Sequence, residues 1–585
     1  MIKNDINQLI ATAIKQLQKK KIFPTALKYT VLVEKTRHPN NGDYASNIAL
    51  TLAKQIRQSP ACIAKQLVAV LPKHHYVKKI SIAHPGFINF VLNDAFYYDA
   101  INETLSRGEN YGHNMLGQGK TVHLEYISAN PTGPLHVGHG RGAVYGSCVA
   151  NLLRASNFKV HSEYYVNDAG RQMRILAFSI WIRYLQRLGI DVKLPDKAYV
   201  GDYILDIAHS IEHNYGDQFS VSYQKYVSLL QQINTDNTET YLDQCIAACE
   251  ATLGPKTFDI IFQFGLNAIL DDIKNDLNEL NVTFDEWFSE QQLLKQGFLN
   301  KGITLLKTHG FVYEQDQALW FKASQFGDEK DRVLIRANGQ PTYFASDVAY
   351  HLYKYEQHYD TIIDIFGADH HGYINRIHGF LKALGKDAEK TIILLVQFAM
   401  LYRGKEKISM STRAGKFITL RELRQEVGLD AARFFYIMRK PEQHLDFDLE
   451  LAKKRSNENP VYYIQYAHAR ICSVQENMIK QGKTWNKHIG LTHLNQLNLN
   501  DEKNLMKAIA QFPDMVASAA RQYAPHQLAH YLQEIAGLFH SYYNATYVLV
   551  EQETLRHARL CLIMAVQQVL SNGLKLLGIG APKSM

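Results

Sequence analysis

The sequence predicts a multidomain α/β protein in which a domain with a parallel sheet lies between a small α+β domain and an all-α bundle. Three observations lead to this prediction. The chain has 585 residues, enough for about three to five domains. A strand pattern, a Gly/Pro-rich turn, a helical pattern and another strand pattern follow one another over residues 121–166, as at the start of a βαβ unit. From about residue 455 onwards the periodicity is helical.

The first region, residues 1–115, combines helical periodicity with short strand-like runs. Apolar residues recur at helical spacing over 47–71, and residues 87–92 form a strand-like run. The N-terminal segment places apolar residues at steps of four and three, which indicates an amphipathic helix rather than a secretory signal. A Gly-rich stretch at 111–119 is a plausible linker, so we expect a small α+β domain to end there.

The second region, residues 116–450, carries the βαβ pattern, and the third, residues 451–585, is the predicted bundle. Helical periodicity covers 138–154, and the segment from about 190 to 320 is polar and mostly helical, which we interpret as insertions into the α/β domain. We expect strands of the parallel sheet at 121–127, 159–166, 361–366 and 391–398.

Composition excludes several classes of protein. The hydrophobic content of 46% suits large cores, and six mostly scattered cysteines are typical of a reduced cytosolic protein rather than a disulfide scaffold. No apolar run approaches the ~18 residues needed to span a membrane, so we expect a soluble, cytoplasmic protein without a membrane partner. The net charge of +8, from 64 basic and 56 acidic residues, permits a nucleic-acid partner without requiring one.

A first chemical motif lies at the strand-to-helix transition after residue 127. It reads Ser-Ala-Asn-Pro-Thr-Gly-Pro-Leu-His-Val-Gly-His-Gly-Arg and ends at Arg141. A helix N-terminus favours phosphate, because its N–H groups are unpaired and its dipole end is positive. Gly138 leaves room for a flat adenine, and His136 and His139 can donate to phosphate oxygens. The alternative is a tight turn with two incidental histidines.

A second motif follows the strand predicted at 391–398. Residues 403–416 combine basic side chains with glycine and small hydroxyl residues, so the loop can close over a triphosphate. Taken alone, a solvated basic loop explains this segment at least as well.

Together the two motifs resemble the HIGH and KMSKS signatures of class I aminoacyl-tRNA synthetases. The wider sequence is similar to arginyl-tRNA synthetases along essentially the whole chain, including residues 124–134, 165–172, 343–350, 367–373, 459–470 and 573–585. Residues 42–45 and 85–89 resemble that family's additional tRNA-contacting domain. The resemblance implies a class I Rossmann-like catalytic domain and an all-α anticodon-binding domain.

The second signature departs from the family pattern. The two usual lysines are replaced by Ser409 and Thr412, and the lysine that some relatives carry three residues before the first histidine is Gly133 here. Which cation holds pyrophosphate therefore stays open among the nearby basic residues, and we favour Lys407 and Arg413. The catalytic residues implied by the resemblance are His136, Gly138, His139, Lys407, Ser409, Met410, Ser411 and Arg413.

The resemblance also implies sites for L-arginine and ATP. A guanidinium is a planar fork of donors that pairs best with carboxylates. Asp347 and Glu125 would bind it, with Tyr343 nearby and Asn130 near the α-amino group. Without the resemblance, a Tyr–Asp pair four residues apart is more often a solvated pair. The ATP site would comprise His136, Gly138, His139, Gly367, Asp369, His370 and Gln397.

We expect no metal site built by the protein itself. Asp369, His370 and His371 are ligand types, but their family-like context is a nucleotide site. Cys245 and Cys249 lack the second pair of ligands that zinc sites favour. Mg²⁺ would accompany ATP instead.

The predicted bundle carries aromatic residues interleaved with a cation. Single-stranded RNA loops are bound by aromatic stacking, and an anticodon is such a loop. We therefore expect tRNA contacts here, although core packing explains any single member equally simply. The residues are Tyr463, Tyr466, His468 and Arg470.

The resemblance implies ATP-dependent attachment of L-arginine to tRNA(Arg) through arginyl-adenylate, releasing AMP and pyrophosphate, by a monomeric enzyme. Two rival hypotheses stay open from the residues alone. A nucleotidyltransferase of the HxGH class also combines the first motif with a Ser-Thr-Arg loop, but such enzymes are small single domains. A non-catalytic RNA-binding protein is supported only by the altered loop.

Overall fold

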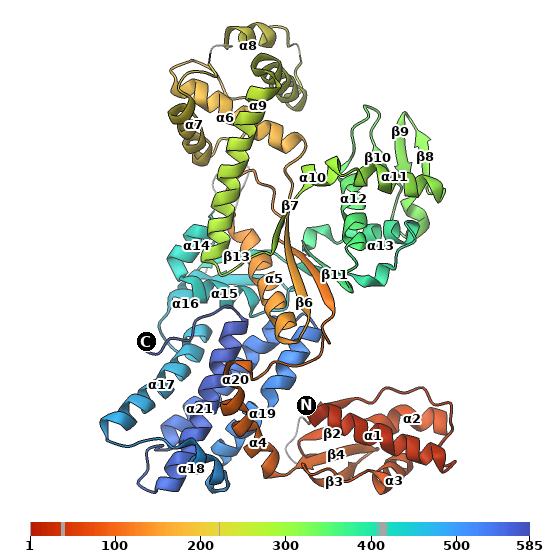
Figure 1. Cartoon of the computed structure of the whole chain (residues 1–585), viewed down its shortest axis with the longest axis vertical. Helices are drawn as coiled ribbons and strands as arrows, with labels where there is room; N and C mark the ends of the chain where they lie inside the picture. The colour runs from red at the N-terminus through yellow and green to blue at the C-terminus, as the bar shows by residue number, and fades with distance from the viewer. Residues whose placement is uncertain (1, 37–40, 221–222, 234, 405, 409–417) are drawn as a thin grey trace.

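The computed structural model describes all 585 residues except 1, 37–40, 221–222, 234, 405 and 409–417. Figure 1 shows a central parallel sheet with a helical bundle below it, a helical body above it and a smaller body at its side. A separate small domain at the N-terminus lies beside the bundle. The predicted multidomain α/β architecture is confirmed.

The N-terminal domain is an antiparallel sheet covered by helices. Its strand order is β1-β2-β4-β3. The helix expected over 47–71 is two helices, because Arg57 adopts a left-handed conformation and Ser59 caps a new helix that begins at a proline. The elements are α1 (Ile2–Lys19), β1 (Val33–Lys35), β2 (Tyr44–Ser46), α2 (Ile48–Ile56), α3 (Pro60–Val70), β3 (Val77–Ala83) and β4 (Phe87–Leu92).

The central sheet is parallel throughout, with the order β7-β6-β5-β11-β12. In chain order this is 3-2-1-4-5, the doubly wound Rossmann arrangement. Successive strands lie on one side of β5 up to β7 and on its other side from β11 onwards. The strand order therefore reverses between β5 and β11, which creates a crevice at their carboxyl ends. The strands are β5 (Thr121–Tyr126), β6 (Lys159–Val166), β7 (Glu286–Ser289), β11 (Thr361–Gly367) and β12 (Thr391–Val396).

Helices cover both faces of this sheet. Helix α5 (Val137–Ala155) packs against the face that carries Tyr126, and Gly146 makes the approach possible, because a Cβ there would lie 2.3 Å from the tyrosine ring. Helix α12 (Tyr343–Glu356) covers the opposite face, where Lys354 contacts Glu125 of β5. The site at the crevice therefore lies between α5 and α12, which come from different parts of the chain.

A helical body is inserted between β6 and β7, as expected for most of the segment 190–320. Its longest helical element, α9, breaks at Gly254, which has φ +73° and precedes Pro255. Strand β7 at the end of this insertion was not expected, because four residues are too few to show a period. The helices are α6 (Arg171–Arg187), α7 (Asp202–Tyr215), α8 (Tyr223–Leu230) and α9 (Thr238–Glu279).

A second insertion separates β7 from β11 and contains an antiparallel sheet of order β10-β9-β8. It supplies α12 to the central sheet. The other elements up to β12 are α10 (Glu290–Lys295), α11 (Phe298–Thr308), β8 (Val312–Gln315), β9 (Ala318–Phe321), η3 (Ala323–Phe326), β10 (Arg332–Ile335), η4 (Ala368–His370), α13 (Tyr373–Ala383) and η5 (Ala388–Lys390).

A short mixed sheet of order β14-β13-β15 and several helices connect the crevice to the bundle. Residues 454–585, all described by the structure, contain helices and no strand, as predicted. The connecting elements are β13 (Ala399–Arg403), β14 (Glu406–Lys407), α14 (Leu420–Val427), α15 (Leu429–Ile437), β15 (Leu445–Asp448) and α16 (Leu449–Lys453). The bundle comprises α17 (Pro460–Lys480), α18 (Lys487–Thr492), η7 (Leu494–Gln496), α19 (Asn500–Arg521), α20 (Pro525–Ala545) and α21 (Glu553–Leu576).

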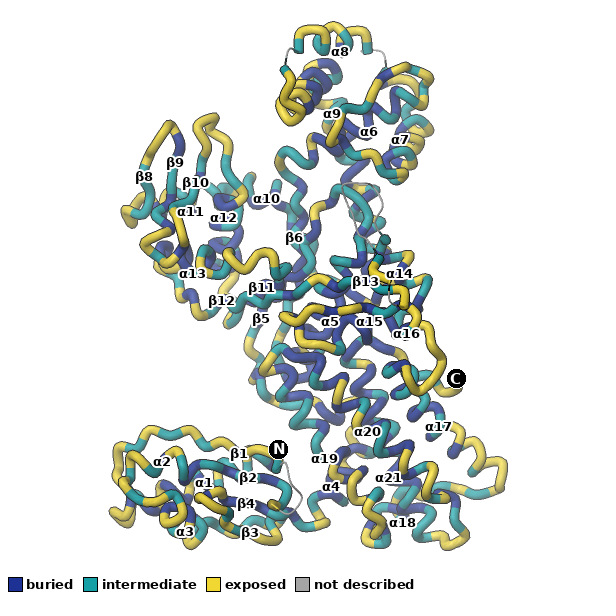
Figure 2. Tube along the Cα trace, turned by 180° about the vertical axis from the view of Figure 1, so that it is seen from behind, coloured by how far each residue is buried: buried dark blue, intermediate teal, exposed yellow. Residues whose placement is uncertain are grey.

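One hydrophobic core runs from α5 through α15 into the bundle, so the two domains share buried surface (Figure 2). Within it, the buried Arg433 guanidinium donates to the carbonyl oxygens of Leu577 (2.8 Å) and Asn281 (3.1 Å), and to Ser147 Oγ (2.9 Å). A Cβ at Gly578 would lie 2.4 Å from this guanidinium. Arg433 therefore joins the C-terminal segment, the helical insertion and α5 at one point.

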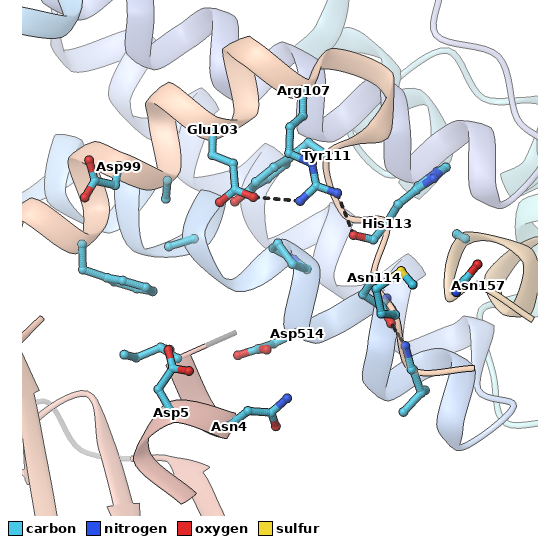
Figure 3. A pocket seen from close by; sticks show the side chains of 18 of the residues that line it. Asn4, Asp5, Asp99, Glu103, Arg107, Tyr111, His113, Asn114, Asn157 and Asp514 are labelled. Atoms are coloured by element: carbon cyan, nitrogen blue, oxygen red, sulfur yellow. Dashed lines mark hydrogen bonds and ion pairs between the residues drawn. The ribbon is translucent and has the colours of Figure 1, made fainter. Parts of the chain in front are cut away.

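The N-terminal domain meets the bundle through polar contacts. Lys507 pairs with Asp43 at 2.9 Å, and Lys35 donates to Gln511. Helix α4 (Asp94–Arg107) connects the two parts and packs on α19. A cavity of about 810 Å³ lies between them, where Asp5, α4 and α19 converge (Figure 3). This cavity is built at the junction between the N-terminal domain and the bundle.

No helix among the described residues is both long enough and apolar enough to cross a membrane.

The Arg433 junction yields a stability prediction. Arg433→Met should lower the free energy of unfolding by on the order of 3 kcal/mol, because buried carbonyl groups lose their donors. Thermal unfolding followed by circular dichroism measures the effect. Arg439→Met, an exposed change in the same segment, is the control. Equal melting temperatures for the two variants would show that the junction contributes nothing.

Candidate active site

The candidate site lies at the carboxyl ends of β5 and β11. Beyond β5 the backbone turns sharply, since Ile127 and Ser128 both have positive φ values, of 70° and 41°. Such conformations are costly for residues with side chains and concentrate at functional sites. They direct the chain from the sheet edge towards the start of α5.

The N-terminus of α5 is capped by the two histidines of the first motif. His136 Nδ1 accepts from the Gly138 N–H at 3.1 Å, and His139 Nδ1 accepts from the His136 N–H at 3.3 Å. The rings stack with centroids 3.8 Å apart. Burial lowers the pKa of both, that of His139 to about 3 with a further contribution from His136. Both are therefore neutral near pH 7, and each places its proton on Nε2.

Two glycines leave space beside this cap. A Cβ on Gly138 would lie 2.8 Å from the His136 ring and 3.5 Å from Phe398. A Cβ on Gly367, at the end of β11, would lie 2.4 Å from an Asp369 carboxylate oxygen and 3.4 Å from Phe398. The structure thus brings both glycines of the predicted ATP site to the same aromatic ring, on opposite sides of the crevice.

The second motif returns to the first. Residues 418–420 pair with residues 135–137: the Val137 N–H donates to Ile418 O at 3.2 Å, and the Leu420 N–H donates to Leu135 O at 2.8 Å. Lys407 is exposed on β14, whereas Ser409, Met410, Ser411 and Arg413 lie outside the described residues. The segment that follows the predicted loop is therefore attached at the N-terminus of α5.

A buried arginine holds the backbone beside the predicted ATP site. Arg141, on α5, donates to the carbonyl oxygens of Gln397 (2.8 Å), Gln443 (2.7 Å) and Lys440 (2.8 Å). Gln397, a predicted ATP contact, directly follows β12, so α5 holds its backbone in place. Asp369 and His370 are exposed at the end of β11, where they form an ion-pair contact of 3.6 Å.

The predicted arginine ligands occupy different environments. Asp347 is half-buried on α12, and its carboxyl has no hydrogen-bond or ion-pair partner among the described residues. Burial raises its pKa to about 7, and the carboxylates of Glu125 and Glu290 add to the shift, with His351 opposing it. Asp347 is therefore a carboxyl that a cationic ligand would stabilise in its ionised form. Tyr343 lies one turn earlier and is 58% exposed.

Glu125 already has a cation. Lys354 Nζ donates to Glu125 Oε2 at 2.6 Å, while Ser128 Oγ donates to Oε1 at 2.8 Å. The charge of Glu125 is thus offset within the protein, unlike that of Asp347. Asn130 lies nearby with its side chain 3.0 Å from that of Asn167, which follows β6.

Sequence reasoning missed one carboxylate near Asp347. Glu290, at the start of α10, is buried, and burial raises its pKa, with hydrogen bonds from Ser346 and Tyr165 opposing the shift. Glu290 directly follows the short, unexpected strand β7, and only this position brings its carboxylate close to Asp347. A stronger strand signal at 286–289 would have identified it.

The predicted tRNA contacts lie on α17. The Arg470 guanidinium is stacked between Tyr466 (4.4 Å) and Tyr543 (4.9 Å), and Tyr463 packs its ring against His540 (4.5 Å). His468, by contrast, is in the bundle interior, where Nδ1 bonds to Pro582 O at 2.9 Å. Tyr466 and Arg470 thus belong to a partly exposed aromatic surface, and His468 anchors the C-terminal segment.

Comparisons with known proteins agree with this geometry. Three family models match: the arginyl tRNA synthetase N-terminal domain at residues 4–92, the catalytic domain of class I (R) tRNA synthetases at 100–453, and the DALR anticodon binding domain at 464–585. The chain is 55% identical to an arginine–tRNA ligase of Coxiella burnetii, over 100% of both chains.

It is also 52% identical to an arginine–tRNA ligase of Legionella pneumophila, over 99% of each chain. The fold matches that of Thermus thermophilus arginyl-tRNA synthetase over 100% of both chains, with a TM-score of 0.76 at 24% identity. On the fold, the site and these relatives, the chain belongs to the arginyl-tRNA synthetase family.

Proposed function

We propose that this chain attaches L-arginine to tRNA(Arg) at the expense of ATP, through arginyl-adenylate. The observation that supports this most directly is the unpaired, half-buried Asp347 carboxyl at the same crevice as the histidine-capped N-terminus of α5. One feature suits a guanidinium and the other a phosphate. A nucleotidyltransferase that does not use arginine as a substrate would need only the feature that suits a phosphate.

Activation requires the arginine carboxylate to attack the α-phosphate in line, while the negative charge on the phosphoryl oxygens is stabilised. The neutral rings of His136 and His139 can donate from Nε2, and the N–H groups of α5 add the positive end of the helix dipole. No side chain forms a covalent bond in this scheme. Positioning and charge stabilisation supply the rate.

Because the loop lacks the two usual lysines, other cations would bind the pyrophosphate. Lys407 is the described member of the pair that we favour, and Arg413 is the other. Mg²⁺ enters with ATP as part of the substrate, and Asp369 at the end of β11 is an exposed carboxylate beside the proposed nucleotide site. Phe398 and the two glycines define where a flat base can lie.

Arginine would bind with its guanidinium on Asp347. Because Lys354 offsets Glu125, this second carboxylate can orient the ligand through its remaining lone pairs without adding a full negative charge. Glu290 and Asn130 line the same pocket. A point ammonium cannot satisfy a planar arrangement of carboxylates, so lysine would be rejected by geometry rather than by editing.

The tRNA would lie along the bundle, with anticodon bases stacking on the surface formed by Tyr466 and Arg470 and its terminal ribose at the crevice. Action as a cytoplasmic monomer is part of the same proposal.

ATP–pyrophosphate exchange with each of the amino acids, with and without tRNA(Arg), tests the function. Of these amino acids, only arginine is expected to support exchange. Exchange with another amino acid, or none with arginine plus tRNA, would refute the proposal.

Asp347→Asn should raise the arginine KM about 10²-fold, the cost of losing charge-assisted hydrogen bonds, while the ATP KM changes little. Steady-state exchange kinetics separate the two constants. Glu356→Gln, which removes a partly exposed carboxylate of the same helix that pairs with Lys301, is the matched control. If both KM values rose equally, Asp347 would not lie in the arginine pocket.

Arginine binding should strengthen as pH rises through about 7. The free Asp347 carboxyl has a raised pKa, and only its ionised form pairs with a guanidinium, so kcat/KM for arginine at pH 6 should be about tenfold below its plateau near pH 8. Asp347→Asn should flatten this rise. A profile that keeps the same midpoint in the variant would assign the titration to another group.

His136 can be separated into its capping and catalytic roles. His136→Ala should remove the cap, at about 1 kcal/mol, and slow adenylate formation on the order of 10²-fold. His136→Asn restores a capping side chain, so it should recover the melting temperature but not the rate in single-turnover measurements. Recovery of both would make the residue purely structural.

A further inference from the structure

A second group of ligand-type side chains lies on the face of the central sheet that α12 covers. Strands β5, β6 and β7 run side by side there (Figure 1). In register, His123 is beside His161, and Glu163 is beside Glu286. Alternating residues of a strand share a face, so all four side chains project from the same side of the sheet.

Three of these residues converge. One ligand atom from each of His161, Glu163 and Glu286 lies within 4.8 Å of the other two. His161 Nε2 is 3.0 Å from Glu286 Oε2 and 4.0 Å from Glu163 Oε2. A tetrahedral ion about 2.1 Å from each ligand would hold two ligand atoms about 3.4 Å apart, a value that these two distances bracket.

The cluster has negative charge without a matching cation. Among the described residues, neither Glu163 nor Glu286 makes an ion pair with a lysine or an arginine. The one buried ammonium under this face, Lys354, is bound to Glu125 and Asp364.

A buried histidine contacts one carboxylate of the cluster. His123 is 1% exposed, and neither ring nitrogen has a hydrogen-bond partner of acceptable geometry among the described residues. Its Nε2 nevertheless lies 3.1 Å from Glu163 Oε1, close enough for an ion-pair contact. Tyr350 also donates to Oε1. Both contacts engage the same carboxylate oxygen and leave Oε2 facing His161.

We propose that His161, Glu163 and Glu286 form a binding site for a divalent transition-metal ion, Zn²⁺ in view of the mixed imidazole and carboxylate ligands. His123 and Tyr350 orient the Glu163 ligand from behind. Side chains of His161 and Glu286 are 29% and 41% exposed, so the ion can enter from solvent and keeps an open position for water. The ion would tie the edge strand β7 to β6.

The site is separate from arginine and ATP, because its ligands lie along the strands rather than at their carboxyl ends. Its role would be to stabilise β7, whose last residue precedes Glu290 of the arginine pocket. A dicationic ion between two carboxylates and a neutral imidazole also balances the charge that the protein leaves uncompensated.

Isothermal titration calorimetry of the EDTA-treated, dialysed full chain with Zn²⁺ at pH 7.5 tests the proposal. Wild type should bind a single ion tightly and gain melting temperature. His161→Ala and Glu286→Gln each remove a half-exposed ligand and should weaken binding by at least about tenfold, with the metal-free melting temperature unchanged. His123→Ala should weaken it less than loss of a ligand does.

Because the chain has 25 histidines, adventitious binding needs its own control. His358→Asn removes an exposed histidine between α12 and β11 and should leave the titration unchanged. Crystals soaked in Zn²⁺ should give an anomalous peak between the three ligands. No saturable binding to wild type, or equal binding to wild type and the His161→Ala/Glu286→Gln double variant, would overturn the proposal.

Discussion

The arrangement of the catalytic crevice depends on one buried ammonium group. Lys354 is fully buried, and its Nζ donates to Glu125 on β5 at 2.6 Å and to Asp364 on β11 at 2.7 Å. These strands are the two between which the sheet order reverses. Burying a charge costs several kcal/mol unless it is well paired. The pairing therefore binds α12 to this point of the sheet and places Asp347, two turns earlier, at the crevice.

The same ammonium determines the electrostatics of the pocket. Although burial raises the pKa of Asp364, Lys354 and His351 hold it below its ordinary value, so the pair beneath the pocket is ionised. With Glu125 offset in this way, Asp347 is left with a raised pKa and without a partner. Glu290 beside it also has a raised pKa and makes no ion pair among the described residues, so a cationic ligand would stabilise the ionised form of either carboxyl.

Much of this could be predicted from the sequence, because the informative signals are local. The strand 159–166 and the helix after residue 137 follow from periodicity, and the histidines of the first motif lie at a strand-to-helix turn. Contacts between distant segments could not be predicted. Nothing in the sequence indicates that Lys354 offsets Glu125, or that a strand at 286–289 brings Glu290 to the pocket. His468 shows the converse: a polar residue in an aromatic run is buried against the C-terminal segment.

The C-terminal segment gives the bundle a direct connection to the catalytic helices. Asp430 of α15 accepts from the Gly580 N–H at 3.0 Å and from Gln465 of α17 at 2.7 Å, and Arg433, one turn later, donates to Leu577 O. Arg433 also donates to Ser147 on α5, the helix whose N-terminus carries the histidine cap. Gln465 belongs to α17, whereas Asp430 and Arg433 belong to α15, so these hydrogen bonds connect a bundle helix to the close-packed core beside α5. Rigid packing between the RNA-binding and catalytic parts follows from the same contacts that stabilise the fold.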